Sequence, residues 1–295
     1  MKAVAFTEFG GPEVLRVLDL PEPHAGPGEV RVRVKAAGVQ PFDAAVRAGW
    51  EPPHLNLGWP RVPGNEFAGV VDEGELAAGT EVLGFTAVQA CAEYIVVPVG
   101  DVTPKPPGMP WDVAGGFTAG TQTASIALEV LRVTAGETLL VHAAAGSVGT
   151  AAVQLGKLAG ATVVGTASEA NQDYLRELGA TPVVYGPELR DRLAPLGVDV
   201  VLDGAGGDAL DVSLELVRDR SRILTLVDHD RAADLGVLVS KSGRSASRLA
   251  ELAALYAKGD LRFHVRRAYP YTEAVAAHRE IETGHGRGKI VLMFP

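Results

Sequence analysis

The 295-residue sequence contains one cysteine, Cys91, and no long apolar run. A single cysteine excludes a disulfide within the chain and every zinc site built from several cysteines. No hydrophobic stretch approaches the roughly twenty residues that a membrane-spanning helix needs. The first residues, Met1–Val4, lead directly into an expected strand. We therefore expect no signal peptide and no membrane span, and a cytoplasmic location.

The sequence also has little positive charge, with 27 Lys and Arg residues against 36 acidic ones and a net charge of −9. Because no basic tract is present, the composition argues against a nucleic-acid-binding protein. A hydrophobic content of 47% is ordinary for a globular enzyme. The length predicts about two domains.

The first hundred residues show the alternation of short strands rather than a helical period. Strands are expected at Lys2–Thr7, Val14–Leu18, Val30–Ala36, Phe67–Val71, Glu81–Phe85 and Glu93–Val97. A short helix is expected over Phe42–Arg47, and Pro104–Pro110 is interpreted as a linker. A longer helix is expected over Val113–Leu131, although the glycines in its first half are unfavourable in a helix.

The segment Thr138–Ser168 predicts a strand, a tight turn, a helix and a second strand. Its turn carries Ala144-x-Gly146-x-x-Gly149 in place of the G-x-G-x-x-G of dinucleotide-binding folds. Gly146 lets the backbone approach a pyrophosphate, which binds the free N–H groups of the helix start at Ser147 and Val148. Gly149 allows close helix–strand packing, and Ala144 keeps the turn tight. A turn without a ligand is the simpler alternative, but the flanking elements favour a dinucleotide cofactor.

The end of the second strand indicates which cofactor is bound. NAD-binding folds place a carboxylate there to hold the ribose 2′-OH. This sequence has Ala167 and Ser168, and its first acid is Glu169. A serine hydroxyl can donate to a 2′-phosphate, which favours NADPH. The nearest cations, Arg190 and Arg192, come much later, and Ser168 as a helix cap is an equally open interpretation.

Strands and helices then alternate, which predicts a parallel sheet with helices on both faces and an α/β fold. Strands are expected at Pro182–Tyr185, Asp199–Asp203, Arg222–Val227, Arg262–Arg267 and Lys289–Phe294, and helices at Glu169–Leu178, Ala209–Val217, Ser245–Lys258 and Tyr271–Thr283.

The order and spacing of several motifs resemble the zinc-independent medium-chain dehydrogenases/reductases of the quinone oxidoreductase (zeta-crystallin-like) type. The motifs are MKAVAFTEFGGPEVL, GEVRVRVKAAGVQPFD, PGNEFAGVV, AEYIVVP, VDVVLDGAGG and AHREIETGHGRGKIVL, together with the Val141–Gly149 turn. The resemblance implies a GroES-like β-rich domain over residues 1–110 and 264–295, and a Rossmann doubly wound parallel sheet over 111–263. The active site would lie in the cleft between them. The cofactor turn also resembles the enoyl reductase domains of polyketide synthases.

The resemblance bears on metal binding and on the catalytic residues. Zinc-dependent relatives carry a cysteine at the position of Gln40 and a histidine at that of Asn65. Since a carboxamide is a poor zinc ligand, we expect no metal. Gln40 and Asp43 match positions beside the nicotinamide and the substrate carbonyl. Gln40 is expected to bind substrate or a water, and Asp43 to hold the loop or the ribose; an N-terminal helix contact is the alternative for Asp43. The tyrosine of some relatives is replaced by Ala45, so no tyrosine proton donor is expected.

Further cofactor contacts are implied by the resemblance alone. Thr123 matches a residue near the nicotinamide amide, and Tyr185 one near the 2′-phosphate, with a buried strand-end tyrosine as the alternative. Asp203 is expected at the cofactor cleft or as a turn-forming residue, and Ala205 near the nicotinamide. The remaining positions reach the nicotinamide from the far side: Leu238, Val239 and Ser240.

Three further ionisable residues lie at or near the ends of expected strands. Arg287 and Lys289 are interpreted as solvated strand-end charges or as phosphate ligands, and His142 as a packed rather than a catalytic residue. The sequence thus predicts an NADPH-dependent reductase that transfers hydride to a quinone or an α,β-unsaturated carbonyl compound. An enoyl-thioester reductase and a non-catalytic NADPH-binding protein are the alternatives. An apolar strand near Leu235–Val239 predicts a homodimer through sheet extension.

Overall fold

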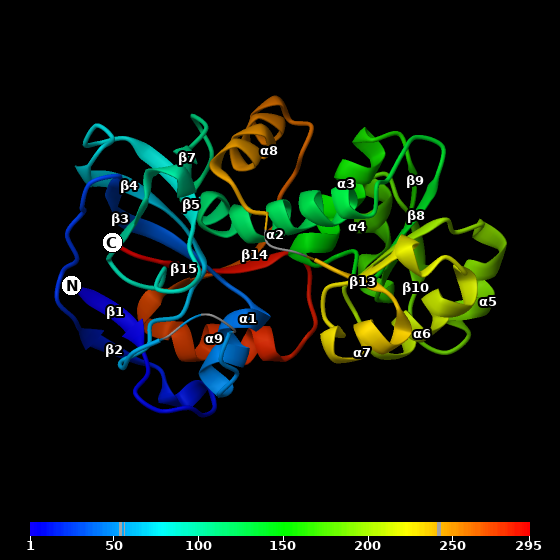
Figure 1. The fold of residues 1–295 in the computed structure, drawn as a ribbon, viewed down its shortest axis with the longest axis horizontal. Coiled ribbons are helices and arrows are strands. Elements are labelled where there is room, and N and C mark those ends of the chain that lie inside the picture. Colours follow the sequence, from blue (N-terminus) through cyan, green and yellow to red (C-terminus); the bar gives the residue numbers. More distant parts are fainter. Residues whose placement is uncertain (53–54, 56, 241–242) are drawn as a thin grey trace. The chain divides into compact units, whose positions relative to one another are not determined.

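The computed structural model describes residues 1–52, 55, 57–240 and 243–295 (Figure 1). The chain divides into two compact units. Unit 1 comprises Met1–Ala119, Ser245–Lys258 and His264–Pro295, and unit 2 comprises Gly120–Arg244 and Gly259–Phe263. No helix in the described part of the chain is long and apolar enough to cross a membrane.

Unit 1 is built on a mainly antiparallel sheet in the order β14-β15-β3-β4-β5-β7, with β6 paired to β3. β14 and β15 pair in parallel, and the β1–β2 hairpin forms a separate small sheet. The strands are β1 (Lys2–Ala5), β2 (Arg16–Asp19), β3 (Glu29–Val39), β4 (Glu66–Gly74), β5 (Glu81–Phe85), β6 (Tyr94–Pro98), β7 (Val102–Pro104), β14 (Val265–Pro270) and β15 (Lys289–Met293). The helices wholly within this unit are α1 (Pro41–Ala48), α8 (Ala246–Lys258) and α9 (Ala274–Glu282).

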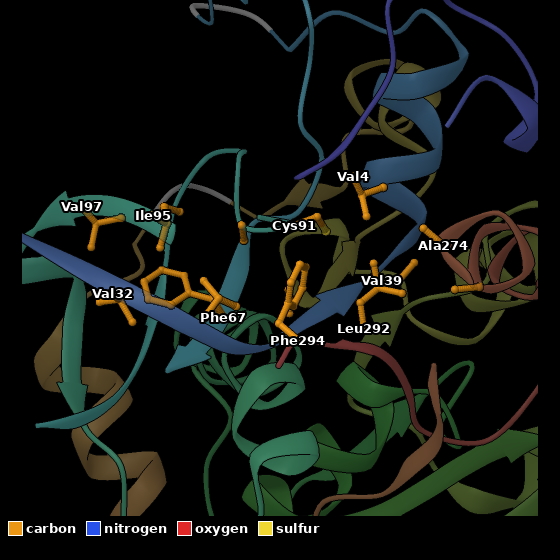
Figure 2. Packing of buried hydrophobic residues seen from close by; sticks show 14 of the residues in the cluster. Val4, Val32, Val39, Phe67, Cys91, Ile95, Val97, Ala274, Leu292 and Phe294 are labelled. Carbon is orange, nitrogen blue, oxygen red and sulfur yellow. The ribbon is translucent and has the colours of Figure 1, made fainter. Parts of the chain in front are cut away.

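The core of unit 1 joins strands that are far apart in the sequence. Val32 of β3, Phe67 of β4, Ile95 of β6 and Leu292 of β15 belong to one buried cluster (Figure 2). Strand β3 contributes to this cluster because burial alternates along it, so that every second residue of its first half faces the core. The final strand therefore completes the sheet that the first hundred residues begin.

Unit 2 is a parallel sheet in the order β10-β9-β8-β11-β12-β13, which is the strand order of dinucleotide-binding folds. Leu139 and Val141 of β8 belong to one buried cluster and Leu140 to another, so both faces of the sheet are covered. The strands are β8 (Thr138–Val141), β9 (Thr162–Ala167), β10 (Thr181–Val184), β11 (Val200–Asp203), β12 (Ile223–Thr225) and β13 (Leu238–Val239). The helices are α3 (Ser147–Leu158), α4 (Gln172–Glu177), α5 (Leu189–Leu193), α6 (Gly207–Leu216) and α7 (His229–Leu235). The predicted α/β class is confirmed.

Helix α2 (Trp111–Val130) is continuous, so the doubt about its first half was wrong. Its glycines are there for packing. A Cβ at Gly115 would lie 2.4 Å from Cβ of Ala36, and one at Gly116 would lie 2.7 Å from Cγ of Lys289. Glycine thus lets the helix approach β3 and β15 more closely than a side chain would allow.

Several predicted boundaries also needed correction. The expected helices at Glu169 and Tyr271 each begin with a turn of 3-10 helix, and the strand expected from Arg262 begins at Val265. Helices α5 and α7 were not predicted, because five and seven residues are too few to show a helical period against the neighbouring polar residues.

Candidate functional site

Asp43 holds the loop at the start of helix α1. Its Oδ2 accepts a hydrogen bond from the backbone N–H of Gln40 at 3.0 Å, and its Oδ1 accepts one from Gly64 N–H at 2.9 Å. The side chain is buried, with 1% of its surface exposed. The geometry is therefore that of the helix-start contact weighed from the sequence. It also fixes the Gly64–Glu66 segment beside Gln40.

Burial raises the pKa of Asp43 from its ordinary value of 3.8 to about 6, although the N–H bonds from Gly64 and Gln40 and the charge of Lys289 lower it. Between about pH 4 and 6 the unfolded chain has lost this proton while the folded chain still holds it. The contribution of Asp43 to stability is therefore largest below about pH 4 and is lost as the pH rises through its folded pKa.

This gives the first prediction. An Asp43→Asn variant cannot titrate, so the difference in unfolding free energy between wild type and variant should shrink between about pH 4 and 6. A shift of about two pKa units corresponds to about 3 kcal/mol. Urea unfolding across this range measures it. Parallel pH curves for the two proteins would contradict the raised pKa.

Lys289 is not the solvated strand-end charge or the phosphate ligand predicted from the sequence. Only 2% of its surface is exposed. Its Nζ lies 2.5 Å from Oε1 of Glu66 and donates to Oε1 of Gln40 at 2.9 Å. Nε2 of Gln40 in turn donates to Oδ1 of Asn65. Four side chains from three separate parts of the sequence thus form one polar network in unit 1.

This network does not suit a zinc ion. The two positions that are cysteine and histidine in zinc-dependent relatives hold Gln40 and Asn65, whose amides bond each other. The neighbouring carboxylate of Glu66 is paired with the ammonium of Lys289, which would repel a cation. Among the described residues, no group of three or more His, Cys, Asp or Glu side chains is arranged to hold a metal. The donor set therefore does not fit zinc.

The predicted cofactor residues of unit 2 gather at one edge of its sheet. In a parallel sheet all carboxyl ends lie at the same edge, where dinucleotides bind. Most of them lie in the segments that follow the strands at that edge: Ala144, Gly146, Ser147, Val148 and Gly149 after β8, Ser168 after β9, Tyr185 after β10 and Ala205 after β11. Asp203 is the last residue of β11, Leu238 and Val239 form β13, and Ser240 follows it. Thr123 lies on α2, one turn after Gly120, where a Cβ would meet Ser147 at 3.1 Å.

The turn after β8 is open at Gly146 and closely packed at Gly149. A Cβ at Gly146 would meet only one atom, Ala143 O at 3.4 Å, so the space in front of this residue is open. No side chain caps the first turn of α3, which leaves its N–H groups available to an anion. Gly149 is different, because a Cβ there would lie 2.4 Å from Ala143 O. Gly149 therefore allows the close packing of helix α3 on the turn, and Gly146 leaves the backbone of the turn accessible.

Ser168 and Tyr185 are neighbours at this edge, since the backbone N–H of Tyr185 bonds Ala167 O at 3.3 Å. Tyr185 is 48% exposed, so the buried strand-end interpretation was wrong. The hydroxyl of Ser168 does not cap the helix; it accepts from the side-chain amide of Asn171 at 3.1 Å. Arg192 donates to Val184 O at 3.2 Å and to Pro187 O at 2.5 Å, which brings a cation to the same corner. Arg190 instead pairs with Glu215.

Asp203 and His142 are occupied by internal contacts. Oδ1 of Asp203 accepts from the N–H groups of Ala205 and Gly206 at 2.9 and 2.8 Å, which is the turn-forming arrangement. His142 bonds Thr166 and Ser213, and burial lowers its pKa to about 4, so it is a packed neutral residue as predicted.

The pairing of Lys289 with Glu66 was not predicted from the sequence, and Arg192 was only one of two arginines considered for the 2′-phosphate. Neither carries a local signal beyond its charge.

Comparison with known proteins places the two units in one family. Residues 26–107 match the model of the alcohol dehydrogenase GroES-like domain, and residues 178–292 match that of zinc-binding dehydrogenase. The quinone oxidoreductase of Pseudomonas aeruginosa is 29% identical over 99% of both chains. The spectinabilin polyketide synthase protein NorB of Streptomyces orinoci is 35% identical over 91% of this chain, which spans only 13% of NorB.

Solved structures of similar proteins point to the same family. The quinone oxidoreductase of Coxiella burnetii matches with a TM-score of 0.90 and 29% identity, over 100% of this chain and 99% of its own. The mycobacterial protein Rv1454c, solved in complex with NADPH, matches with a TM-score of 0.87 and 29% identity over 100% of both chains. Fold and glycine-rich turn together define a pyridine-nucleotide-binding protein with a GroES-like domain. The chain belongs to the medium-chain dehydrogenases/reductases, in the family of the quinone oxidoreductases, and the resemblance seen in the sequence is confirmed.

Proposed function

We propose that the protein is a zinc-free, NADPH-dependent reductase that transfers hydride to a quinone or an α,β-unsaturated carbonyl compound. The observation that carries the proposal is the network at Gln40, in which the buried ammonium of Lys289 pairs with Glu66 and donates a hydrogen bond to Oε1 of Gln40, a position where zinc-dependent relatives carry a metal ligand. NADPH would supply the hydride. The quinone oxidoreductases among the relatives, and the NADPH complex of a structural neighbour, support this choice of chemistry.

Each unit has a separate task in this proposal. In unit 2, the first-turn N–H groups of α3 bind the pyrophosphate, and Thr123, Ala205 and the β13 end contact the nicotinamide. In unit 1, Gln40 donates an N–H to the substrate carbonyl oxygen. That oxygen gains negative charge as the β-carbon of an enone, or the ring of a quinone, accepts hydride, so a donor there lowers the barrier. Water then protonates the enolate or hydroquinone anion.

The 2′-phosphate would lie between Ser168, Tyr185 and Arg192. A carboxylate at Ser168 would repel this phosphate and instead accept a hydrogen bond from a ribose hydroxyl. We therefore expect Ser168→Asp to weaken NADPH binding about tenfold or more, equivalent to about 1.4 kcal/mol, while NADH binding is unchanged or improved. Fluorescence titration with both cofactors at matched salt measures this. Equal losses for NADPH and NADH would place the phosphate elsewhere.

The same titration of the wild-type protein tests the function itself. NADPH preference followed by turnover of quinones or enones supports the proposal. Binding without turnover on any carbonyl compound would favour a non-catalytic nucleotide-binding protein. Binding of neither cofactor would overturn the proposal.

A second candidate is reduction of an enoyl thioester in a biosynthetic pathway. The match to polyketide synthase proteins, one of them 35% identical, favours it. Both reactions deliver hydride to a carbon conjugated with a carbonyl, so the same donor at Gln40 serves either. Comparing kcat/KM for an enoyl thioester with that for a quinone separates the two.

We also propose a homodimer through the edge strand β13, where Val239 is 37% exposed.

A further inference from the structure

Lys289 lies in a space that the fold keeps open for it. The residue begins β15, and Glu66 begins β4. A Cβ at Gly38 would lie 2.1 Å from Oε1 of Glu66, and one at Gly116 would lie 2.7 Å from Cγ of Lys289. The other oxygen of Glu66 accepts from the backbone N–H of Ala119 at 2.6 Å. Two glycines and a backbone donor thus hold this ion pair in place.

The ammonium of Lys289 decides which way the amide of Gln40 faces. An ammonium group has only donors, so the atom of Gln40 that lies 2.9 Å from Nζ is its carbonyl oxygen. The amide nitrogen is therefore on the other side, where one hydrogen bonds Asn65. Its second hydrogen has no acceptor among the residues that the structure describes, and Gln40 is only half-buried. The Gln40 residue is therefore partly accessible to a ligand.

Without the ammonium, the two ends of the amide are nearly equal in size, and rotation by half a turn presents an oxygen instead. An oxygen at that place would repel a substrate oxygen that gains negative charge, whereas an N–H stabilises it. We propose that Lys289, held by Glu66, is a positioning residue that keeps Gln40 as a hydrogen-bond donor to the substrate carbonyl. This inference rests on the proposed function and adds a residue to it.

The test removes both charges together, because removing one alone leaves the other buried without a partner. In the Glu66→Gln/Lys289→Met double variant we expect the thermal midpoint and the Kd for NADPH to stay close to those of wild type, and kcat to fall by about tenfold or more. In a Gln40→Leu background, the same two changes should alter kcat by less than about twofold, since there is no amide left to position. Lys289→Arg retains a donor and should keep most of the activity.

A matched control is the pair Lys105 and Glu81 in the same unit, whose Nζ–Oε2 distance is 2.9 Å and whose lysine side chain has 5% of its surface exposed. Glu81→Gln/Lys105→Met should leave kcat near the wild-type value. Retained kcat in the Glu66/Lys289 double variant, or an equal loss with and without Gln40, would overturn the positioning role. Loss in Lys289→Arg as large as in the double variant would also overturn it. Absence of turnover in the wild type would instead overturn the proposed function.

Discussion

Replacing Gly149 by alanine should abolish NADPH binding and lower the free energy of unfolding by about 3 kcal/mol. The added Cβ would lie 2.4 Å from Ala143 O and 2.5 Å from Cα of Ala144. Both are backbone atoms of the turn, so no side chain can rotate away to make room. Helix α3 must move off β8, and its first-turn N–H groups move with it.

Gly146→Ala is the matched control. Its Cβ would lie 3.4 Å from one atom, and its backbone has φ −70°, which alanine adopts without strain. Its stability should therefore stay within about 0.5 kcal/mol of wild type. The methyl group would still obstruct the approach of a pyrophosphate, so we expect NADPH binding to weaken about tenfold or more. Urea unfolding and fluorescence titration separate the two effects. Wild-type affinity in Gly149→Ala would contradict the assignment of the turn.

The elements of unit 2 could be predicted because their signals are local. The apolar run Leu139–Val141, the small residues after it and the helical period from Val148 lie within one short segment. Parallel strand order then brings Ser168, Tyr185 and Asp203 to one edge without further information. The alternation of strands and helices does not indicate which of these residues contact a cofactor; only the family resemblance indicates that.

The errors concern contacts between distant segments. Glycine has a low helix propensity, so Gly115 and Gly116 made the start of α2 look unfavourable in the sequence. In the structure these two glycines allow the close approach of Ala36 and Lys289 to the helix. Lys289 carries a charge near the chain end, and a sequence has no means of showing that Glu66 lies within 2.5 Å of it. Burial of a charge depends on its partner, and the partner is set by tertiary structure.

Arg47 ties helix α1 to helix α9 and to the N-terminal segment. Its surface is 1% exposed. Nε donates to Gly10 O at 3.1 Å, Nη1 to Nδ1 of His278 at 3.4 Å, and Nη2 to the carboxylate of Glu282. Burial and the nearby guanidinium lower the pKa of His278 to about 3, so its ring is neutral and accepts this bond. Helix α1, which contains Arg47, begins at Pro41 directly after Gln40 and carries Asp43 in its first turn.

We therefore expect Arg47→Met to lower the free energy of unfolding by about 3 kcal/mol, because it leaves a partly buried acceptor at Gly10 and a buried one at His278 unpaired and removes the partner of Glu282. The looser helix should also reduce kcat more than it changes the Kd for NADPH, since the cofactor contacts are in unit 2. Arg279→Met is the control: it removes an arginine of α9 that pairs with Glu13 at 2.5 Å, but both side chains are 60% exposed. Screening by water makes such a pair weak, so its urea midpoint should hardly change. Equal midpoints for the two variants would show that the contacts of Arg47 do not hold helix α1, which directly follows Gln40.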